Sequence, residues 1–136
     1  MKLHSRTLAN GLRLQAVEMP GTKVVTTMIL AGAGSRYETI DLAGISHFLE
    51  HMFFKGTPKY PGAKLAGTIE AFGGEINAFT SFDYTCYYIN TPSKYLNSSI
   101  DVLLDMVSNP SFFENFHISN KIGAEVNASM MKKIKP

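Results

Sequence analysis

Cysteine is nearly absent from the chain, since Cys86 is the only one among its 136 residues, and a single thiol excludes an internal disulfide. No stretch approaches the ~20 apolar residues that a membrane helix requires, and residues 1–6 lack the apolar segment of a secretory signal. The 13 Lys and Arg against 11 Asp and Glu give a formal charge of only +2, which is too weak a field to favour nucleic acid. These absences predict a soluble, cytoplasmic protein without a membrane or nucleic-acid partner.

The composition is that of one globular domain. Apolar residues make up 45% of the chain and charged residues 18%, and a chain of this length buries roughly two-thirds of its unfolded surface on folding. No repeat, linker or low-complexity tract divides the sequence. We therefore expect residues 1–136 to form a single domain around one core.

Turn residues and periodicity predict the order of the elements. Asn10-Gly11 predicts a hairpin, and the expected strands are 3–8, 12–17, 23–31 (on the same sheet as the hairpin), 75–80 and 85–90. The expected helices start at Ile45 and end near Gly56, cover 64–72, run from Leu96 to before Pro110, and extend from about 113 to 131. This order indicates an α+β fold in which helices pack on an antiparallel sheet.

The first expected helix carries two histidines on one side. His47 and His51 are four residues apart, so they lie about 40° from each other around a helix and can reach one point beside it. An apolar stripe of Ile45, Phe48, Leu49, Met52 and Phe53 occupies the opposite side. We therefore expect the imidazoles to face a cavity, another element or water instead of the core.

This arrangement suits a zinc site. Neutral imidazole is a preferred zinc ligand, and a catalytic zinc keeps three protein ligands with its fourth position open for water. Glu50 lies beside both histidines, where its carboxylate can take a proton from the metal-bound water without joining the ligands. The spacing thus predicts one Zn²⁺ per chain, with Glu50 as the general base of peptide-bond hydrolysis. The alternative is a solvent-facing helix that shows two histidines and a glutamate by chance.

Longer motifs around these residues favour the metal site. His-x-x-Glu-His is the inverzincin signature, and residues 43–57, 73–81 and 84–88, together with Asn10-Gly11-Leu12, resemble the insulinase (pitrilysin-type) peptidase family and its mitochondrial processing peptidase relatives. The resemblance covers most of the chain between Leu8 and Asn109. It implies a two-layer half-unit that is the amino-terminal portion of a longer metallopeptidase.

The resemblance also implies partners and site residues. Family members enclose a chamber for short or unfolded peptides, so a peptide substrate and a complementary peptidase domain or homo-oligomer are expected. In relatives, the strand that contains Asn77 and Ala78 pairs with the substrate backbone, which fits strand addition at a sheet edge. Without the resemblance, ordinary strand packing, with Asn77 satisfying local backbone groups, would be the simpler interpretation.

A third metal ligand is expected in a later helix. The resemblance implies a glutamate some seventy residues beyond the second histidine, and Glu125, 74 residues after His51, is the natural match. Gapless counting from the upstream motifs puts Asn127 near that position instead. As a bare sequence feature, Glu125 also fits a solvated helix residue.

Two functional hypotheses follow. The first is a zinc-dependent endopeptidase module in which His47, His51 and Glu125 hold the metal. The second is a non-catalytic, metal-binding or scaffolding subunit that needs a partner chain to form a working peptidase. The intact signature favours the first, whereas the absence of the further domains of relatives favours the second.

Overall fold

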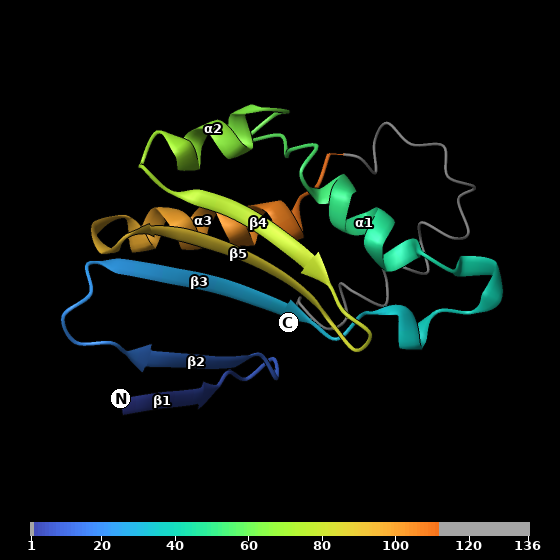
Figure 1. The fold of residues 1–136 in the computed structure, drawn as a ribbon, viewed down its shortest axis with the longest axis horizontal. Coiled ribbons are helices and arrows are strands. Elements are labelled where there is room, and N and C mark those ends of the chain that lie inside the picture. The colour runs from blue at the N-terminus through green and yellow to red at the C-terminus, as the bar shows by residue number, and fades with distance from the viewer. Residues whose placement is uncertain (1, 112–136) are drawn as a thin grey trace.

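A computed structural model describes residues 2–111 of the chain (Figure 1). The strands are β1 (Lys2–Thr7), β2 (Arg13–Glu18), β3 (Val24–Ala31), β4 (Glu75–Thr80) and β5 (Thr85–Pro92). The α-helices are α1 (Ile45–Phe53), α2 (Lys64–Glu70) and α3 (Leu96–Ser108), with short 3₁₀ helices at Ser35–Tyr37, Ile40–Leu42 and Ser93–Tyr95. These bounds agree with the expected ones to within about three residues, and the helix expected over 113–131 lies outside the described residues.

The central sheet is antiparallel and has the order β3-β5-β4. β5 pairs with β3 from Pro92 opposite Val24 to Thr85 opposite Ala31, and its other edge pairs with all of β4. In β5 the odd-numbered positions from 85 to 91 are all buried, and these alternate residues point to the same face of the sheet. That face is the one covered by helices.

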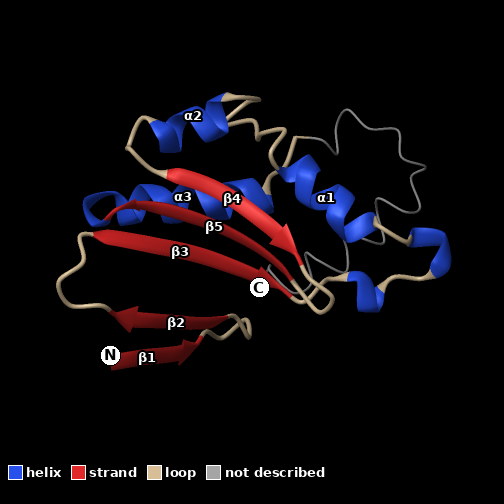
Figure 2. Ribbon diagram, in the orientation of Figure 1, coloured by secondary structure: helices blue, strands red, loops and turns tan. Residues whose placement is uncertain are grey.

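The helices form a second layer on this face. α3 packs against β3 and β5, whereas α1 and α2 pack against β4. Figure 2 shows the strands in red with α3 passing behind them. The buried core between the layers consists of Leu49, Met52, Phe53, Leu65, Ile69, Tyr87, Ile89, Val102, Leu103, Met106 and Val107. The predicted α+β class, an antiparallel sheet with helices packed on it, is confirmed.

The prediction that the hairpin shares a sheet with 23–31 is wrong. β1 and β2 pair with each other in a separate two-stranded sheet, and every described residue of both strands is exposed. Figure 1 shows this hairpin beyond the outer edge of β3. Among residues 2–111, β3 pairs only through its edge towards β5, and the hairpin strands pair with each other through their own turn, so no ladder joins the hairpin to β3.

The face of the central sheet opposite the helices is exposed within the described part of the chain. It presents the side chains of Val24, Met28, Leu30 and Phe79, which are each more than two-fifths exposed. Over residues 2–111, the structure contains no helix that is long and apolar enough to cross a membrane.

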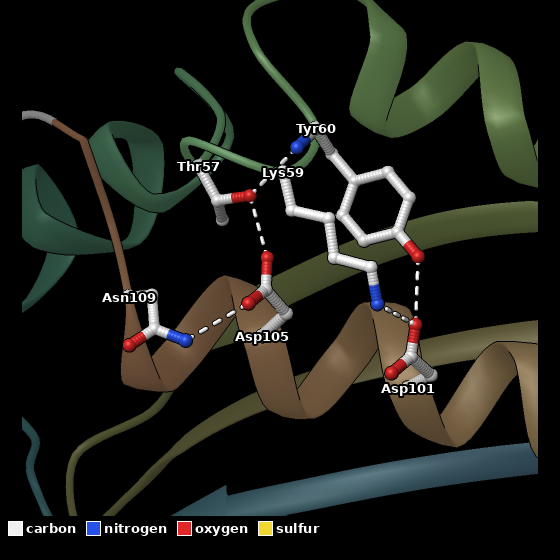
Figure 3. Close-up of polar contacts among 6 residues, drawn as sticks. All are labelled: Thr57, Lys59, Tyr60, Asp101, Asp105 and Asn109. Atoms are coloured by element: carbon white, nitrogen blue, oxygen red, sulfur yellow. Dashed lines mark hydrogen bonds and ion pairs between the residues drawn. The ribbon is translucent and has the colours of Figure 1, made fainter.

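A polar clasp holds the segment after α1 against α3 (Figure 3). The Thr57 hydroxyl donates to Asp105 Oδ2 at 2.6 Å, while Lys59 Nζ and the Tyr60 hydroxyl donate to Asp101 Oδ2 at 2.6 and 2.7 Å. Hydrogen bonds from Lys59 and then Tyr60 hold the pKa of Asp101 below its usual value. Thr57 is fully buried, so the clasp fixes the chain where α1 ends.

At Gly56, the backbone after α1 lies very close to the backbone of residues 60–62. The φ of Gly56 is +102°, and a Cβ built there would lie 2.4 Å from the Gly62 nitrogen and 2.6 Å from the Tyr60 carbonyl oxygen. Both atoms belong to the backbone, which cannot move aside as a side chain can. The position therefore requires glycine for two separate reasons.

Replacing Gly56→Ala should lower the free energy of unfolding by more than about 2 kcal/mol, because left-handed strain of about 1–2 kcal/mol is joined by overlap with backbone atoms. The matched control is Gly62→Ala in the same loop, where φ is +56° and no atom lies within 4 Å of the built Cβ. Urea unfolding gives the free energy of unfolding of each variant. Gly56→Ala should lose stability through both backbone strain and overlap, whereas Gly62→Ala should lose it through strain alone. Equal losses would contradict the close approach at Gly56.

Candidate metal centre

A carboxylate holds the amino-terminal end of α1. Glu38 accepts hydrogen bonds from the Gly44 N–H at 2.7 Å and the Ser46 N–H at 2.9 Å. These amides are among the donors that a helix leaves without intrahelical partners at its start. The bond from the Ser46 amide is the largest cause that lowers the pKa of Glu38. The helix that bears the histidines is therefore anchored from outside by a negative charge on its positive end.

The two histidines converge. The Nε2 atoms of His47 and His51 are 3.1 Å apart, and their ring centroids are 4.6 Å apart with an angle of 57° between the planes. Two nitrogens each about 2.0–2.1 Å from a tetrahedral zinc would be about 3.3–3.4 Å apart. Both residues are exposed, so an ion can reach them. The pair thus fits two of the ligands of one zinc ion.

Glu50 is turned away from the solvent that the histidines face. Its side chain is on the buried side of α1, with the residue only 8% exposed, and Oε2 accepts a hydrogen bond from the Thr80 hydroxyl of β4.

The expected apolar stripe is corrected at one position, because Phe48 is 38% exposed. The contact of α1 with β4 buries the Glu50 side of the helix and leaves Phe48 outside.

Tyr87 lies close enough to Glu50 to be influenced by its charge. The tyrosine is 1% exposed and its ring meets Phe53 edge-on at 5.2 Å. Burial, and then the negative charge of Glu50, raise the pKa of Tyr87 far above its usual value. Its hydroxyl makes no hydrogen bond with the described residues. The phenol is thus a neutral group beside the carboxylate.

The described residues do not supply a complete metal site. Within 2–111, no group of three or more His, Cys, Asp or Glu side chains lies close enough together to hold an ion. The expected third ligand, Glu125, and the alternative position Asn127 both lie outside the described residues. The structure therefore brings together His47 and His51, places Glu50 on the buried side of the same helix, and does not test the third ligand.

Asn77 and Ala78 lie on the same strand as Thr80, at the edge of the sheet. β4 pairs with β5 on one side, and no described strand pairs with its other side. The Ala78 N–H donates to the Asn77 side-chain Oδ1 at 2.8 Å. This local bond is the simpler role considered for Asn77, and it occupies an amide that an incoming strand would otherwise use.

Sequence reasoning missed the threonines around Glu50. Ile76, Ala78 and Thr80 are the partly buried positions of β4, so Thr80 is the polar member of a series that otherwise packs against the core. Thr85, its partner on β5, is 1% exposed and donates to the Ala33 carbonyl at 2.8 Å. The signal available in the sequence was Thr80 itself, a polar residue at a position of β4 where the alternation predicts a side chain that points towards the core.

The comparisons with known proteins identify the family of the chain. The sequence pattern of the family described as Insulinase (Peptidase family M16) matches residues 13–134. The chain belongs to the insulinase family of peptidases. The resemblance in the motifs around the histidines is thereby confirmed as family membership.

Relatives within the insulinase family carry peptidase names. An "uncharacterized zinc protease" of Bacillus subtilis (strain 168) is 44% identical over 109 residues, which cover 80% of this chain and 27% of that protein. A "probable mitochondrial-processing peptidase subunit beta" of Arabidopsis thaliana is 41% identical over 108 residues, which cover 79% of this chain and 20% of that protein. The chain thus spans about a quarter of the length of these relatives.

A solved structure supports the same fold. The crystal structure of a protease from Helicobacter pylori matches with a TM-score of 0.79 and 33% identity, over 93% of this chain and 31% of that one. The arrangement of helices on an antiparallel sheet is therefore shared with a protease.

Replacing Glu38→Gln should lower the free energy of unfolding at pH 7 by about 0.5–1 kcal/mol, because a charge is lost at the helix amino terminus. The folded-state pKa of Glu38 lies below its ordinary value of 4.5, so its contribution is present above that value and is lost as pH falls through the folded pKa. Urea unfolding at neutral pH and at about pH 3 should show the difference shrinking.

The matched control for Glu38 is Asp41→Asn, an exposed acid in the following 3₁₀ helix whose carboxylate makes no hydrogen bond with the described residues. Its unfolding curve should shift less at pH 7. A loss in Glu38→Gln that stays the same at both pH values would argue against the charged cap.

Proposed function

We propose that the chain is the amino-terminal module of a zinc-dependent endopeptidase that hydrolyses peptide bonds in short or unfolded polypeptides. The observation that carries the proposal is the 3.1 Å approach of His47 Nε2 and His51 Nε2 on the exposed side of α1, with the Glu50 carboxylate on the same helix. Membership of a peptidase family and relatives named zinc proteases support it.

In this proposal, His47 and His51 hold one zinc ion per chain and Glu125 completes the ligands. When bound, zinc lowers the pKa of a water molecule that it binds to about 7 and polarises the carbonyl of the scissile bond. The two imidazoles are already oriented by the helix, so metal binding requires little rearrangement of α1.

Glu50 is the proposed general base. It takes a proton from the attacking water and passes it to the nitrogen of the leaving amine, which cannot depart as an anion. Its burial supports this role because a carboxylate shielded from bulk water keeps a defined geometry. Glu50 acts on protons and does not join the metal ligands.

A second candidate is a non-catalytic, metal-binding or scaffolding subunit that needs a partner chain to form a working peptidase. One observation favours it: no cluster of three metal-binding side chains is present within residues 2–111. A complementary peptidase domain, or a second copy of the chain, would then complete the site.

The purified chain should hold about one zinc ion, measured by elemental analysis after dialysis. Glu50→Gln should keep that zinc and lose about 10²–10⁴-fold in the rate of peptide cleavage, because it removes the proton acceptor alone. His51→Ala should lose the zinc itself. A wild-type chain that binds zinc and cleaves no peptide would favour the scaffolding role instead.

We also propose that substrate adds a strand at Asn77 and Ala78, along the edge of β4 with which no strand of residues 2–111 pairs. An edge strand offers unpaired amides and carbonyls to an extended peptide, and the exposed Phe79 on the same strand can contact a substrate side chain. Binding would require the Asn77 side chain to release the Ala78 N–H.

Peptides that are N-methylated at alternate positions should separate into two groups when they bind to zinc-loaded Glu50→Gln, which cannot turn them over. In one group, the methylated amides are those that would donate hydrogen bonds to β4, and binding should weaken by roughly fivefold per lost bond, since each is worth about 1 kcal/mol. In the other group, the methylated amides point away from β4. These peptides are the matched control and should bind as the unmethylated peptide does. Equal affinity for both groups would contradict strand addition.

A further inference from the structure

A single hydroxyl from the sheet holds the carboxylate of Glu50. We propose that Thr80 is a positioning residue that fixes Glu50 Oε2 through its hydrogen bond and leaves Oε1 free to exchange protons. This inference rests on the proposed function, because it gives Glu50 a defined orientation for acting as base. It assigns part of the machinery to β4, outside the helix that carries the metal-binding signature.

The protons of the neighbouring hydroxyls determine which group binds Glu50. A threonine hydroxyl has one proton to donate, and Thr85 gives its proton to the Ala33 carbonyl at 2.8 Å. Thr85 Oγ1 is 3.5 Å from Thr80 Oγ1, at the limit of a hydrogen bond. The proton of Thr80 is therefore available for Glu50, which receives it.

No other described group replaces Thr80. The Tyr87 hydroxyl is buried near Glu50 and makes no hydrogen bond with the described residues, and Oε1 of Glu50 accepts none from them either. Glu50 is only 8% exposed as a residue, and a carboxylate is costly to bury without a donor. Among residues 2–111, the orientation of Glu50 thus depends on the hydroxyl of Thr80.

The two contact residues belong to rigid elements. Glu50 is one turn before Phe53, which packs on Tyr87 of β5, and Thr80 is paired with Thr85 at the end of the β4–β5 ladder. A side chain held by the packing of a helix and a strand keeps the geometry that proton transfer needs better than one on a loop.

The test uses Thr80→Val, which keeps the shape and removes the donor, and Thr80→Ser, which keeps the donor. With a peptide substrate, Thr80→Val should lower kcat by about 10–100-fold, because a misplaced base loses alignment. KM and zinc per chain should stay as in the wild type. Thr80→Ser should restore kcat to within a few-fold, which a general loss of packing would not allow.

The matched control is Thr27→Val on β3. Its hydroxyl is also buried but makes no hydrogen bond with the described residues, so the same chemical change should leave kcat unaltered. A Thr80→Val variant that cleaves at the wild-type rate, or a Thr27→Val variant that loses as much, would overturn the inference while the proposed function stands.

A readout without activity separates the inference from the proposed function. In the metal-free chain labelled with ¹³C at the glutamate carboxyl carbons, the Glu50 signal is the one missing from Glu50→Gln. It should shift in Thr80→Val, return in Thr80→Ser and stay in place in Thr27→Val. An unmoved signal in Thr80→Val would overturn the contact. A shifted signal with no cleavage by zinc-loaded wild type would uphold the contact and overturn the catalytic role.

Discussion

The packing of α1 on β4 and β5 is the constraint on which the rest of the site depends. Phe53 meets Tyr87 edge-on in the core, and this contact fixes the rotation of the helix about its axis. Neighbouring residues of a helix differ by about 100° in direction. If α1 were rotated differently about its axis, the histidines would therefore point towards the sheet and Glu50 towards solvent. The same burial that stabilises the fold thus separates an exposed imidazole pair from a buried carboxylate.

Local patterns predicted most of the elements, whereas the assembly of the sheets required long-range contacts. Asn10-Gly11 identified the hairpin, and the change from a period of two to a period of 3.6 at Ile45 identified α1. The β-branched-rich run at 24–31 suits a strand beside any neighbour, and nothing in it distinguishes β5 from the hairpin. The partner is fixed by residues more than fifty positions away, so the sheet membership of the hairpin was predicted wrongly.

The site was predictable to the extent that one helix defines it. His47 and His51 converge because of their spacing alone, and the position of Glu50 between them in the sequence identified it as the proposed base. The burial of Glu50 and the exposure of Phe48 depend on where β4 meets the helix, which no local pattern contains. Thr80 is a further case, since its role at the carboxylate follows from the register of β4 on β5.

That register gives the turn between β4 and β5 an evolutionary constraint on its length. The Ser81 N–H donates to the Tyr84 carbonyl at 2.8 Å, and this closed turn sets which residue of β4 faces which residue of β5. Because the side chains of a strand alternate, a slip of one residue would bring Phe79 or Ser81 to the position of Thr80 beside Glu50. Substitutions in this turn can accumulate, but an insertion or deletion that shifts the ladder by one residue would remove the Thr80 hydroxyl from the carboxylate.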